Sequence, residues 1–172
     1  IYSDLRNRGY VIKLDDPWLI KNKETGEFQK CYIFLSKDNF NPWLFKERNG
    51  IVAVVDPMLE INYYTFFFEE PKGEFNESYE NSQIDEFEIQ VVQDLTKRGC
   101  AIKSGLKYGT EFIVYVKRDE KHSRYMLKIY LERMIWLDIT ALVRVSHGVK
   151  KILLIAFNEN GIKYLGFRWL RP

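Results

Sequence analysis

The chain has 172 residues, 46% of them hydrophobic and 16% aromatic, which is enough for one substantial core or two small ones and excludes a disordered chain. Its 26 basic and 24 acidic residues leave a net charge of +2, so bulk charge does not indicate a nucleic-acid partner. Any such role must come from where the charges are placed.

The first part of the chain predicts mostly strands. Residues 1–9 are predicted to be the end of a helix that stops at Gly9, and a strand is predicted at residues 10–13. Residues 14–30, with seven charged side chains, are predicted to be a loop. Three further strands, rich in β-branched and aromatic residues and separated by turn-forming residues, are predicted at residues 31–36, 50–56 and 61–69.

The composition changes abruptly at residues 69–83, which are acidic and polar and contain Pro71 and Gly73. From residue 84, apolar side chains recur at mostly three- and four-residue spacings up to Gly99, which predicts a helix. We therefore expect a first unit at residues 1–68, a linker at residues 69–83 and a second unit at residues 84–172.

The second unit predicts another sheet. Strands are expected at residues 100–103, 111–117, 124–131, 151–157 and 163–169, with a helix at residues 137–149. In the second of these strands Tyr115 points away from the face that carries Val114 and Val116. The predicted fold class is α/β (α+β): two related helix–sheet units, the second with a central β-sheet flanked by helices.

An internal repeat supports two related units. The segments DLRNRGYVIK at residues 4–13 and DLTKRGCAIK at residues 94–103 agree at six positions: Asp, Leu, the Arg that precedes Gly, that Gly, Ile and Lys. Aligning CYIFLSKD with FIVYVKRD sets Phe34 or Leu35 opposite Tyr115, and the first copy has no histidine. The first unit is therefore expected to keep the architecture without the chemistry.

Cysteine and histidine usage bounds the cofactors and the location. Cys31 and Cys100 form no CxxC pair, and two histidines in the whole chain make no metal-type cluster, so we expect no metal and no cofactor. We expect reduced thiols in a cytoplasmic protein. The longest apolar runs are far shorter than the roughly 18 residues that cross a bilayer, so no membrane partner is expected. The sequence begins at Ile1, and a fragment or a processed product is expected.

The chain resembles the catalytic domain of the tRNA-splicing endonucleases, archaeal type, in segments that follow one another in order. These are RGCAIKSGLKYGTEFIVY, HSRYMLKIY, ITALVRVSHGVKKILLIAF and KYLGFRWLRP. The match covers residues 84–172, and residues 1–13 resemble the start of the same domain in a degenerate form. This arrangement is similar to members of the family in which a non-catalytic and a catalytic unit are fused.

The resemblance implies a reaction and three catalytic residues. The ribose 2′-OH attacks the adjacent phosphorus without a metal, which gives a 2′,3′-cyclic phosphate and a 5′-OH. Tyr115, His122 and Lys151 match the family's base, acid and cation. Histidine, with an ordinary pKa of about 6.5, suits the acid, whereas tyrosine, at about 10, needs nearby cations to act as a base. Lys150 is the alternative to Lys151.

The resemblance also implies a grip on RNA. The family holds the bulged base beside the cut between two arginines, and guanidinium planes suit stacking on an unpaired base. Arg144 matches the first arginine, and Arg168, with Arg171 in reserve, is expected to be the second. His147, near the end of the predicted helix, is expected to have a structural role or to interact with the helix dipole.

These observations predict a tRNA-intron lyase that cleaves precursor tRNA at bulge-helix-bulge sites. Two cuts need two active centres, so one triad per chain implies a homodimer or a partner endonuclease subunit. The alternative is a non-catalytic RNA-binding or assembly subunit of a splicing endonuclease complex. A restriction-type metal site is disfavoured because the E-x-K pattern occurs at Glu70-Pro71-Lys72, in the expected linker.

Overall fold

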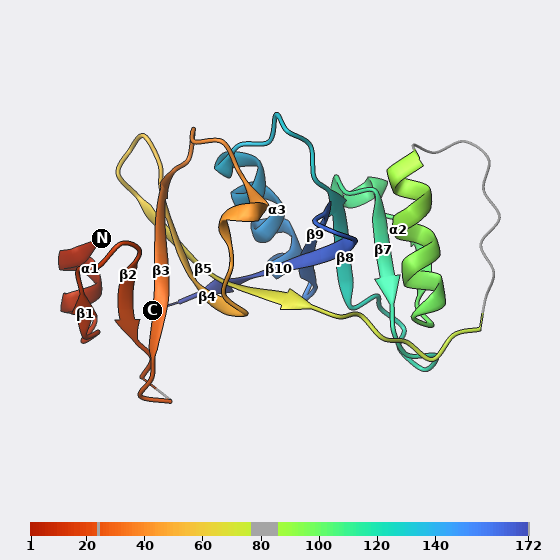
Figure 1. The fold of residues 1–172 in the computed structure, drawn as a ribbon, viewed down its shortest axis with the longest axis horizontal. Helices are drawn as coiled ribbons and strands as arrows, with labels where there is room; N and C mark the ends of the chain where they lie inside the picture. Colours follow the sequence, from red (N-terminus) through yellow and green to blue (C-terminus); the bar gives the residue numbers. More distant parts are fainter. Residues whose placement is uncertain (24, 77–85, 172) are drawn as a thin grey trace.

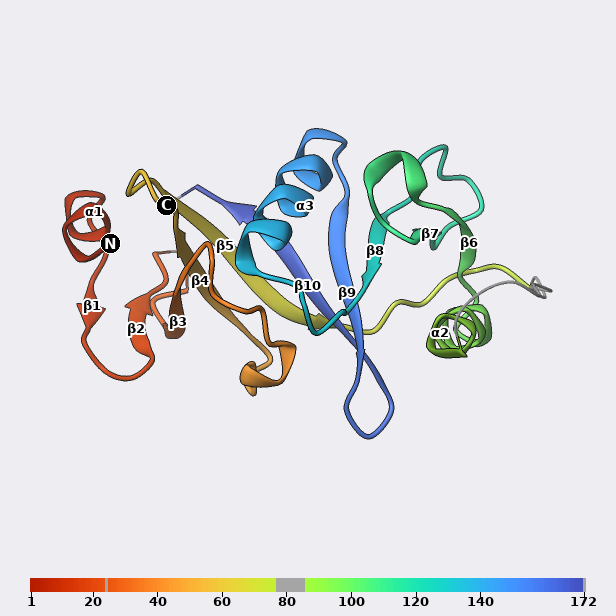
Figure 2. The same cartoon turned by 90° about the horizontal axis from the view of Figure 1, so that it is seen from above.

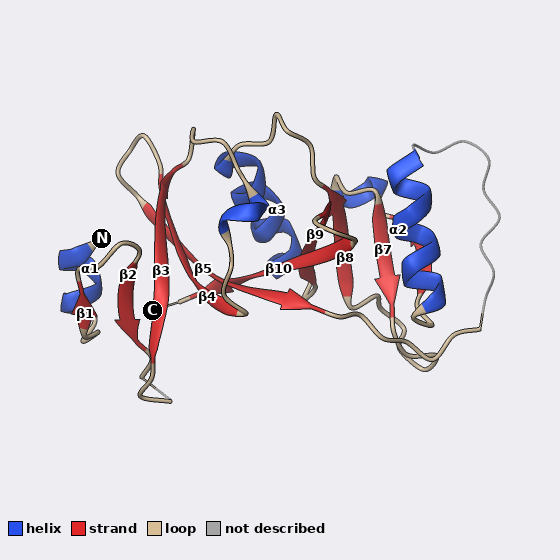
Figure 3. Ribbon diagram, viewed as in Figure 1, coloured by secondary structure: helices blue, strands red, loops and turns tan. Residues whose placement is uncertain are grey.

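The computed structural model describes residues 1–23, 25–76 and 86–171, and these form a mixed α+β fold around one ten-stranded sheet (Figures 1 and 3). The helices are α1 (Tyr2–Asn7), α2 (Glu86–Lys97) and α3 (Trp136–Gly148), with short 3-10 helices η1 (Pro42–Leu44) and η2 (Leu106–Tyr108). The strands are β1 (Ile12–Lys13), β2 (Trp18–Lys21), β3 (Phe28–Leu35), β4 (Asn49–Val55), β5 (Ile61–Glu69), β6 (Ala101–Ser104), β7 (Phe112–Tyr115), β8 (Tyr125–Ile129), β9 (Ile152–Asn158) and β10 (Ile162–Leu170).

The sheet has the order β1-β2-β3-β4-β5-β10-β9-β8-β7-β6, so the two halves of the chain meet at its centre. In each half every neighbouring pair is antiparallel except the third strand with the fourth, β3 with β4 and β8 with β9. β5 and β10 pair antiparallel, with Phe66 opposite Phe167. The five strands after α1 therefore follow the same pairing pattern as the five strands after α2.

A carboxylate contact also recurs in the two halves. The hydroxyl of Tyr63 donates a 2.8 Å hydrogen bond to Asp4, and that of Tyr164 donates one of 2.7 Å to Asp94. Both tyrosines are the third residue of their strands, β5 and β10, and both aspartates lie in the helix that begins their half. In each half the arginine four positions later, directly after the helix, binds the same carboxylate. The repeat in the sequence thus corresponds to a repeat in contacts.

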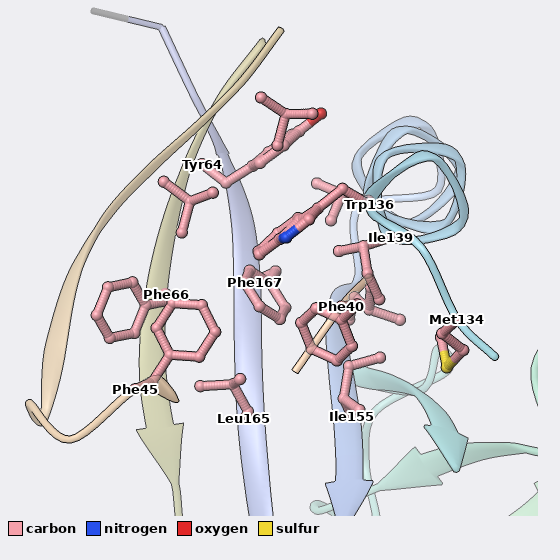
Figure 4. Close-up of a cluster of buried hydrophobic side chains, with 14 of the residues drawn as sticks. Phe40, Phe45, Tyr64, Phe66, Met134, Trp136, Ile139, Ile155, Leu165 and Phe167 are labelled. Atoms are coloured by element: carbon pink, nitrogen blue, oxygen red, sulfur yellow. The ribbon is translucent and has the colours of Figure 1, made fainter. Parts of the chain in front are cut away.

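The largest core lies between α3 and the middle of the sheet (Figure 4). Trp136, at the start of α3, is 0% exposed and stacks on Phe34, with ring centroids 4.5 Å apart. Asp138 stabilises the start of α3 by accepting a 2.9 Å hydrogen bond from the backbone of Ile135. Phe167 and Phe40 pack edge-on against Trp136. This core fixes α3, and therefore its C-terminal end, against β9 and β10.

The opposite face of the sheet carries the other two clusters. Along β10, Leu165 and Phe167 face α3, whereas Tyr164 and Leu170 belong to the clusters that α2 and α1 cover. Figure 2 shows α3 on one side of the sheet and α2 on the other. None of the helices in the described ranges is long and apolar enough to cross a membrane.

Most predicted elements are confirmed, but the loop at residues 14–30 is wrong. β2 and the start of β3 lie there, because Trp18–Lys21 pairs with a strand on each side and Ile20 is 0% exposed. In β2 the backbone N–H and C=O groups are hydrogen-bonded to the neighbouring strands, although many of the side chains around it are charged. Glu69, the first residue of the linker predicted at residues 69–83, is the last residue of β5, and residues 77–83 lie outside the described residues.

The alignment of the strand containing Phe34 and Leu35 with that of Tyr115 is also wrong. β3 holds in the first half the place that β8 holds in the second, and β2 holds the place of β7. The register of β1 with β2 can be compared with that of β6 with β7. Lys21, the residue after Ile20, then holds in the first half the position that Tyr115 holds in the second. The sequence alignment failed because β2 is short and lies among charged residues.

Candidate active site

Tyr115 ends β7, near one edge of the sheet. Val114 and Val116, 0% and 5% exposed, point into the α2 side, so Tyr115 points to the side of η2 and α3, as the strand pattern predicted. The ammonium of Lys103, on β6, lies 5.3 Å from the centre of the Tyr115 ring.

The end of α3 determines how the two adjacent lysines differ. Lys150 has a φ of 56°, the left-handed conformation in which helices commonly end. The backbone N–H of Lys151 then donates a 2.8 Å hydrogen bond to the carbonyl of Ser146, and β9 begins at the next residue. As a result Lys150 is exposed and Lys151 is half-buried.

The side chain of Lys151 reaches the segment between β7 and β8. Its Nζ donates a 2.7 Å hydrogen bond to the backbone oxygen of Ser123, the residue after His122. Its Nζ also lies 5.9 Å from the ring centre of Tyr108. Burial lowers the pKa of Lys151 most; Tyr108 acts to raise this pKa, and the positive charge of Lys107 lowers it further.

His122 is exposed in the segment that leads into β8, whereas Ser123 is only 3% exposed. The buried serine anchors the segment, so the imidazole is presented to solvent from a fixed backbone. A hollow of about 350 Å³ is lined by Glu120, Lys121, His122, Ser123, Arg124, Lys150 and Ile152. The histidine therefore lies in a surface depression that is rich in positive charge.

The sheet register relates Tyr115 to Lys151. The ladder pairs Val114 with Tyr125, and Tyr125 with Ile152, so Arg124 lies between Tyr115 and Lys151 on adjacent strands. Two strand spacings put the Cα atoms of Tyr115 and Lys151 about 10 Å apart. The structure thus brings Lys151 into contact with the backbone beside His122, and places Tyr115 at the same level two strands away.

Arg124 is a residue that the sequence reasoning missed. It is exposed, lines the hollow with His122, and its guanidinium lies 5.6 Å from the ring centre of Tyr125. The signal that could have found it is its place directly after His-Ser, where a strand begins. A planar guanidinium there can bind phosphate oxygens.

Arg144 and Arg168 contact different aromatic rings. The guanidinium of Arg144, on α3, lies 6.0 Å from the ring centre of Trp169, whereas that of Arg168 lies 4.9 Å from the ring centre of Phe67. Successive residues of a strand point to opposite faces, so Trp169, and not Arg168, faces α3. Trp169 is a second residue that the sequence reasoning missed. A tryptophan next to a matched arginine in a terminal strand was the available signal.

A second hollow, of about 320 Å³, lies beside the end of α3. Its lining is Ser146, His147, Lys150, Lys151, Ile152, Arg168 and Trp169. Both hollows include Lys150 and Ile152, so they flank the start of β9, where Lys151 lies. His147 is in the last turn of α3, where a histidine interacts favourably with the helix dipole, and its ring centre is 6.1 Å from that of Trp169.

The arrangement offers an imidazole, a phenol and an ammonium within one basic surface region, together with a half-buried indole. Among the described residues there is no group of three or more His, Cys, Asp or Glu side chains that could hold a metal ion. The polar groups can serve acid–base chemistry and charge stabilisation at a phosphate.

The comparisons with known proteins agree with this class of site. Residues 86–164 match the family model described as tRNA intron endonuclease, catalytic C-terminal domain. The chain is 30% identical over 159 residues to a tRNA-splicing endonuclease of Pyrococcus horikoshii, covering 89% of this chain and 85% of that protein. A tRNA-splicing endonuclease of Thermoplasma volcanium is 29% identical over 153 residues, which cover 85% of this chain and 47% of that protein.

A third relative, the tRNA-splicing endonuclease of Methanothermobacter thermautotrophicus, is 40% identical over 89 residues, 48% of this chain and 52% of that protein. The chain thus spans about half the length of several curated relatives that it matches. The chain belongs to the tRNA-splicing endonuclease family. The family predicted from the four sequence segments is therefore confirmed.

Proposed function

We propose that the protein is a tRNA-intron endonuclease that cuts precursor tRNA at bulge-helix-bulge splice sites in the cytoplasm. The proposed reaction is a metal-independent transesterification. The ribose 2′-oxygen attacks the neighbouring phosphorus, the bond to the 5′-oxygen breaks, and the products carry a 2′,3′-cyclic phosphate and a 5′-OH. The proton lost by the 2′-OH and the proton gained by the 5′-oxygen need separate carriers.

In this proposal Tyr115 takes the proton of the 2′-OH, His122 gives a proton to the leaving 5′-oxygen, and Lys151 stabilises the charge on the non-bridging oxygens. The observation that carries the proposal is the 2.7 Å hydrogen bond from Lys151 Nζ to the backbone oxygen of Ser123. It ties the cation, Lys151, to the residue next to the acid, Ser123, although these two residues are 28 positions apart in the chain. It also favours Lys151 over Lys150.

The RNA grip is proposed to include Arg144 with Trp169. The ring of Trp169 is half-buried beneath the Arg144 guanidinium, and an unpaired base can stack on either plane. Arg168, the second arginine expected from the sequence, is proposed to bind a phosphate instead, since its guanidinium lies over Phe67 and not over Trp169.

We propose that the chain consists of two related units, residues 1–68 and 84–172, of which only the second is catalytic. The matching strand order and the Tyr63–Asp4 and Tyr164–Asp94 contacts support this relationship. In the first unit Lys21 holds the position equivalent to Tyr115, and the unit contains no histidine. It therefore lacks both the base and the acid of the proposed kind. Two cuts per intron then require a homodimer or a partner endonuclease subunit.

The test is incubation of the protein with a bulge-helix-bulge transcript in EDTA, with analysis of the product ends. Cleavage to cyclic phosphate and 5′-OH ends is expected, and His122→Ala is expected to slow it by at least about 100-fold. His147→Ala is the comparison variant, because it removes the other histidine, which lies in the second hollow and not beside Ser123, and it should slow cleavage far less than His122→Ala.

Two results would contradict the proposal. Tight binding of the transcript without any cleavage, whether or not a partner endonuclease subunit is added, would favour the alternative of a non-catalytic RNA-binding or assembly subunit. A chemical step that requires Mg²⁺ would exclude the metal-independent mechanism.

A further inference from the structure

We infer that Tyr108 is a positioning residue of this site, whose ring, together with the backbone oxygen of Ser123, seats the ammonium of Lys151. The inference rests on the proposed function of Lys151. The two contacts come from different segments: Ser123 lies just before β8, and Tyr108 ends η2, in the segment between β6 and β7. Lys151 itself starts from the end of α3, so three segments converge on one ammonium group.

The backbone that carries Tyr108 is firmly held. Its N–H donates a 2.8 Å hydrogen bond to the carbonyl of Gly105. A methyl group added to Gly105 would approach the hydroxyl oxygen of Thr110 to 2.4 Å, so η2 is pressed against the strand that follows it. The Thr110 hydroxyl, in a residue 4% exposed, lies within hydrogen-bond distance of the carbonyls of Gly105 and Phe112. The backbone from which the Tyr108 ring extends is therefore held in place without RNA.

The ammonium of Lys151 needs such a seat. A lysine has a flexible four-carbon stem, and one hydrogen bond to Ser123 fixes its distance but not its direction. Burial disfavours its charge, and Lys107 repels it, as the lowered pKa of Lys151 reflects. Other charged or titratable groups near it include Lys150, His147 and Arg168 of the second hollow, Arg124 on the adjacent strand, and His122 next to Ser123. The negative face of the Tyr108 ring favours a cation, and both Lys107, at 4.9 Å, and Lys151, at 5.9 Å, lie near its centre.

This role belongs to the ring and not to the hydroxyl of Tyr108. The Nζ of Lys151 lies 5.9 Å from the centre of the Tyr108 ring, and phenylalanine offers the same face. Tyr115, beside Lys103, keeps the proposed role of base. Tyr108→Phe and Tyr108→Leu therefore separate the ring from the hydroxyl and from simple bulk.

The experiment measures single-turnover cleavage of a bulge-helix-bulge transcript as a function of RNA concentration. Tyr108→Leu is expected to lower the maximal rate roughly tenfold with little change in the half-saturating RNA concentration, and Tyr108→Phe to stay within about threefold of the parent. Tyr10→Leu is the matched control, since Lys23 lies 4.0 Å from that ring in the first half of the chain. It should not change the rate of the folded protein.

A second measurement needs no RNA and stands even if the proposed function fails. The rate of acetylation of Lys151 relative to Lys150, measured by mass spectrometry, should rise several-fold in Tyr108→Leu and stay unchanged in Tyr108→Phe. Equal acetylation ratios in the parent protein, Tyr108→Leu and Tyr108→Phe would refute the inference that the Tyr108 ring positions the ammonium of Lys151. Equal loss of cleavage in the Phe and Leu variants would overturn the ring's role in favour of the hydroxyl. Absence of cleavage in the parent protein would instead refute the proposed function.

Discussion

Lys151 donates a 2.7 Å hydrogen bond to the backbone oxygen of Ser123, and this contact joins the end of α3 to the segment that carries His122. The acceptor is a main-chain atom, so a substitution of Ser123 leaves it in place. The contact explains why two adjacent lysines are not equivalent. Lys150 takes the left-handed backbone position that lets the chain leave α3, and Lys151 is the first residue that can point back to the sheet.

We therefore predict that Lys151→Ala slows transcript cleavage by at least about 100-fold, because a preorganised cation at a phosphate commonly contributes that much. Lys150→Ala should stay within about threefold. Since burial lowers the pKa of Lys151 below its ordinary 10.5, the ammonium is lost as pH rises through that lowered value. Cleavage should then decline on the alkaline side before pH 10.5 is reached, and single-turnover rates from pH 6 to about 10 measure this. Equal rates for the two alanine variants would contradict the assignment.

A second prediction concerns the aromatic partner of Arg144. Trp169→Ala should weaken binding of a bulge-helix-bulge RNA by about tenfold or more, because base stacking on an aromatic side chain contributes roughly 1–3 kcal/mol. Trp169→Phe should restore part of the affinity. Arg168→Ala should weaken binding less and mainly at low salt, as expected for a phosphate contact.

Filter binding at two salt concentrations distinguishes these outcomes. If Arg168→Ala weakens RNA binding more than Trp169→Ala does, and equally at both salt concentrations, Arg168 and not Trp169 would be the partner of Arg144 in holding the base. The assay uses the His122→Ala protein so that the RNA stays intact.

Local pattern was sufficient for much of the fold. Strand β5 matches the predicted limits, residues 61–69, because a run of aromatic and β-branched residues between turn-formers is a strong signal. The face of Tyr115 followed from the alternation of a strand that is buried on one side. The family followed from motifs in the second half, and residues 86–164 match its model.

What failed depended on contacts between distant segments. β2 is a strand because β1 and β3 pair with it on both sides, which residues 14–30 alone do not reveal. That Trp169 lies beside Arg144 depends on the phase of β10, which its pairing with β5 and β9 fixes, whereas the expected role of Arg168 stays a prediction. The acceptor for Lys151 is a backbone oxygen, and a backbone oxygen has no sequence signature.

The repeated Tyr–Asp contact gives a prediction about stability and pH. Burial alone would raise the pKa of Asp4, but the hydrogen bonds from Tyr63 and Arg8 outweigh it and lower that pKa below 3.8. A lowered carboxyl pKa contributes stability that is complete above the unfolded value and is lost as pH falls through the folded value. Tyr63→Phe should therefore cost about 1 kcal/mol at pH 7 and progressively less below pH 3.8.

Urea unfolding at pH 7 and at about pH 3 measures this difference. Tyr2→Phe, in a residue that is 45% exposed, is the control and should be neutral at both values. A cost for Tyr63→Phe that does not change with pH would show that the lost hydroxyl acts through packing and not through the carboxylate.

The junction between the two halves gives the last prediction. Gly166, on β10, lies opposite Phe67 of β5, and a methyl group added to Gly166 would approach the Phe67 ring to 2.5 Å. The same ring carries the guanidinium of Arg168 at 4.9 Å, so a displaced ring moves the arginine with it. Gly166→Ala should destabilise the protein by about 1–3 kcal/mol through overpacking. Gly148→Ala is the matched control, because it lies in α3 with no atom within 4 Å of the added methyl group, and it should be neutral or stabilising. Thermal unfolding of both variants checks this, and an unchanged midpoint for Gly166→Ala would mean that β5 and β10 separate enough to accept the methyl group.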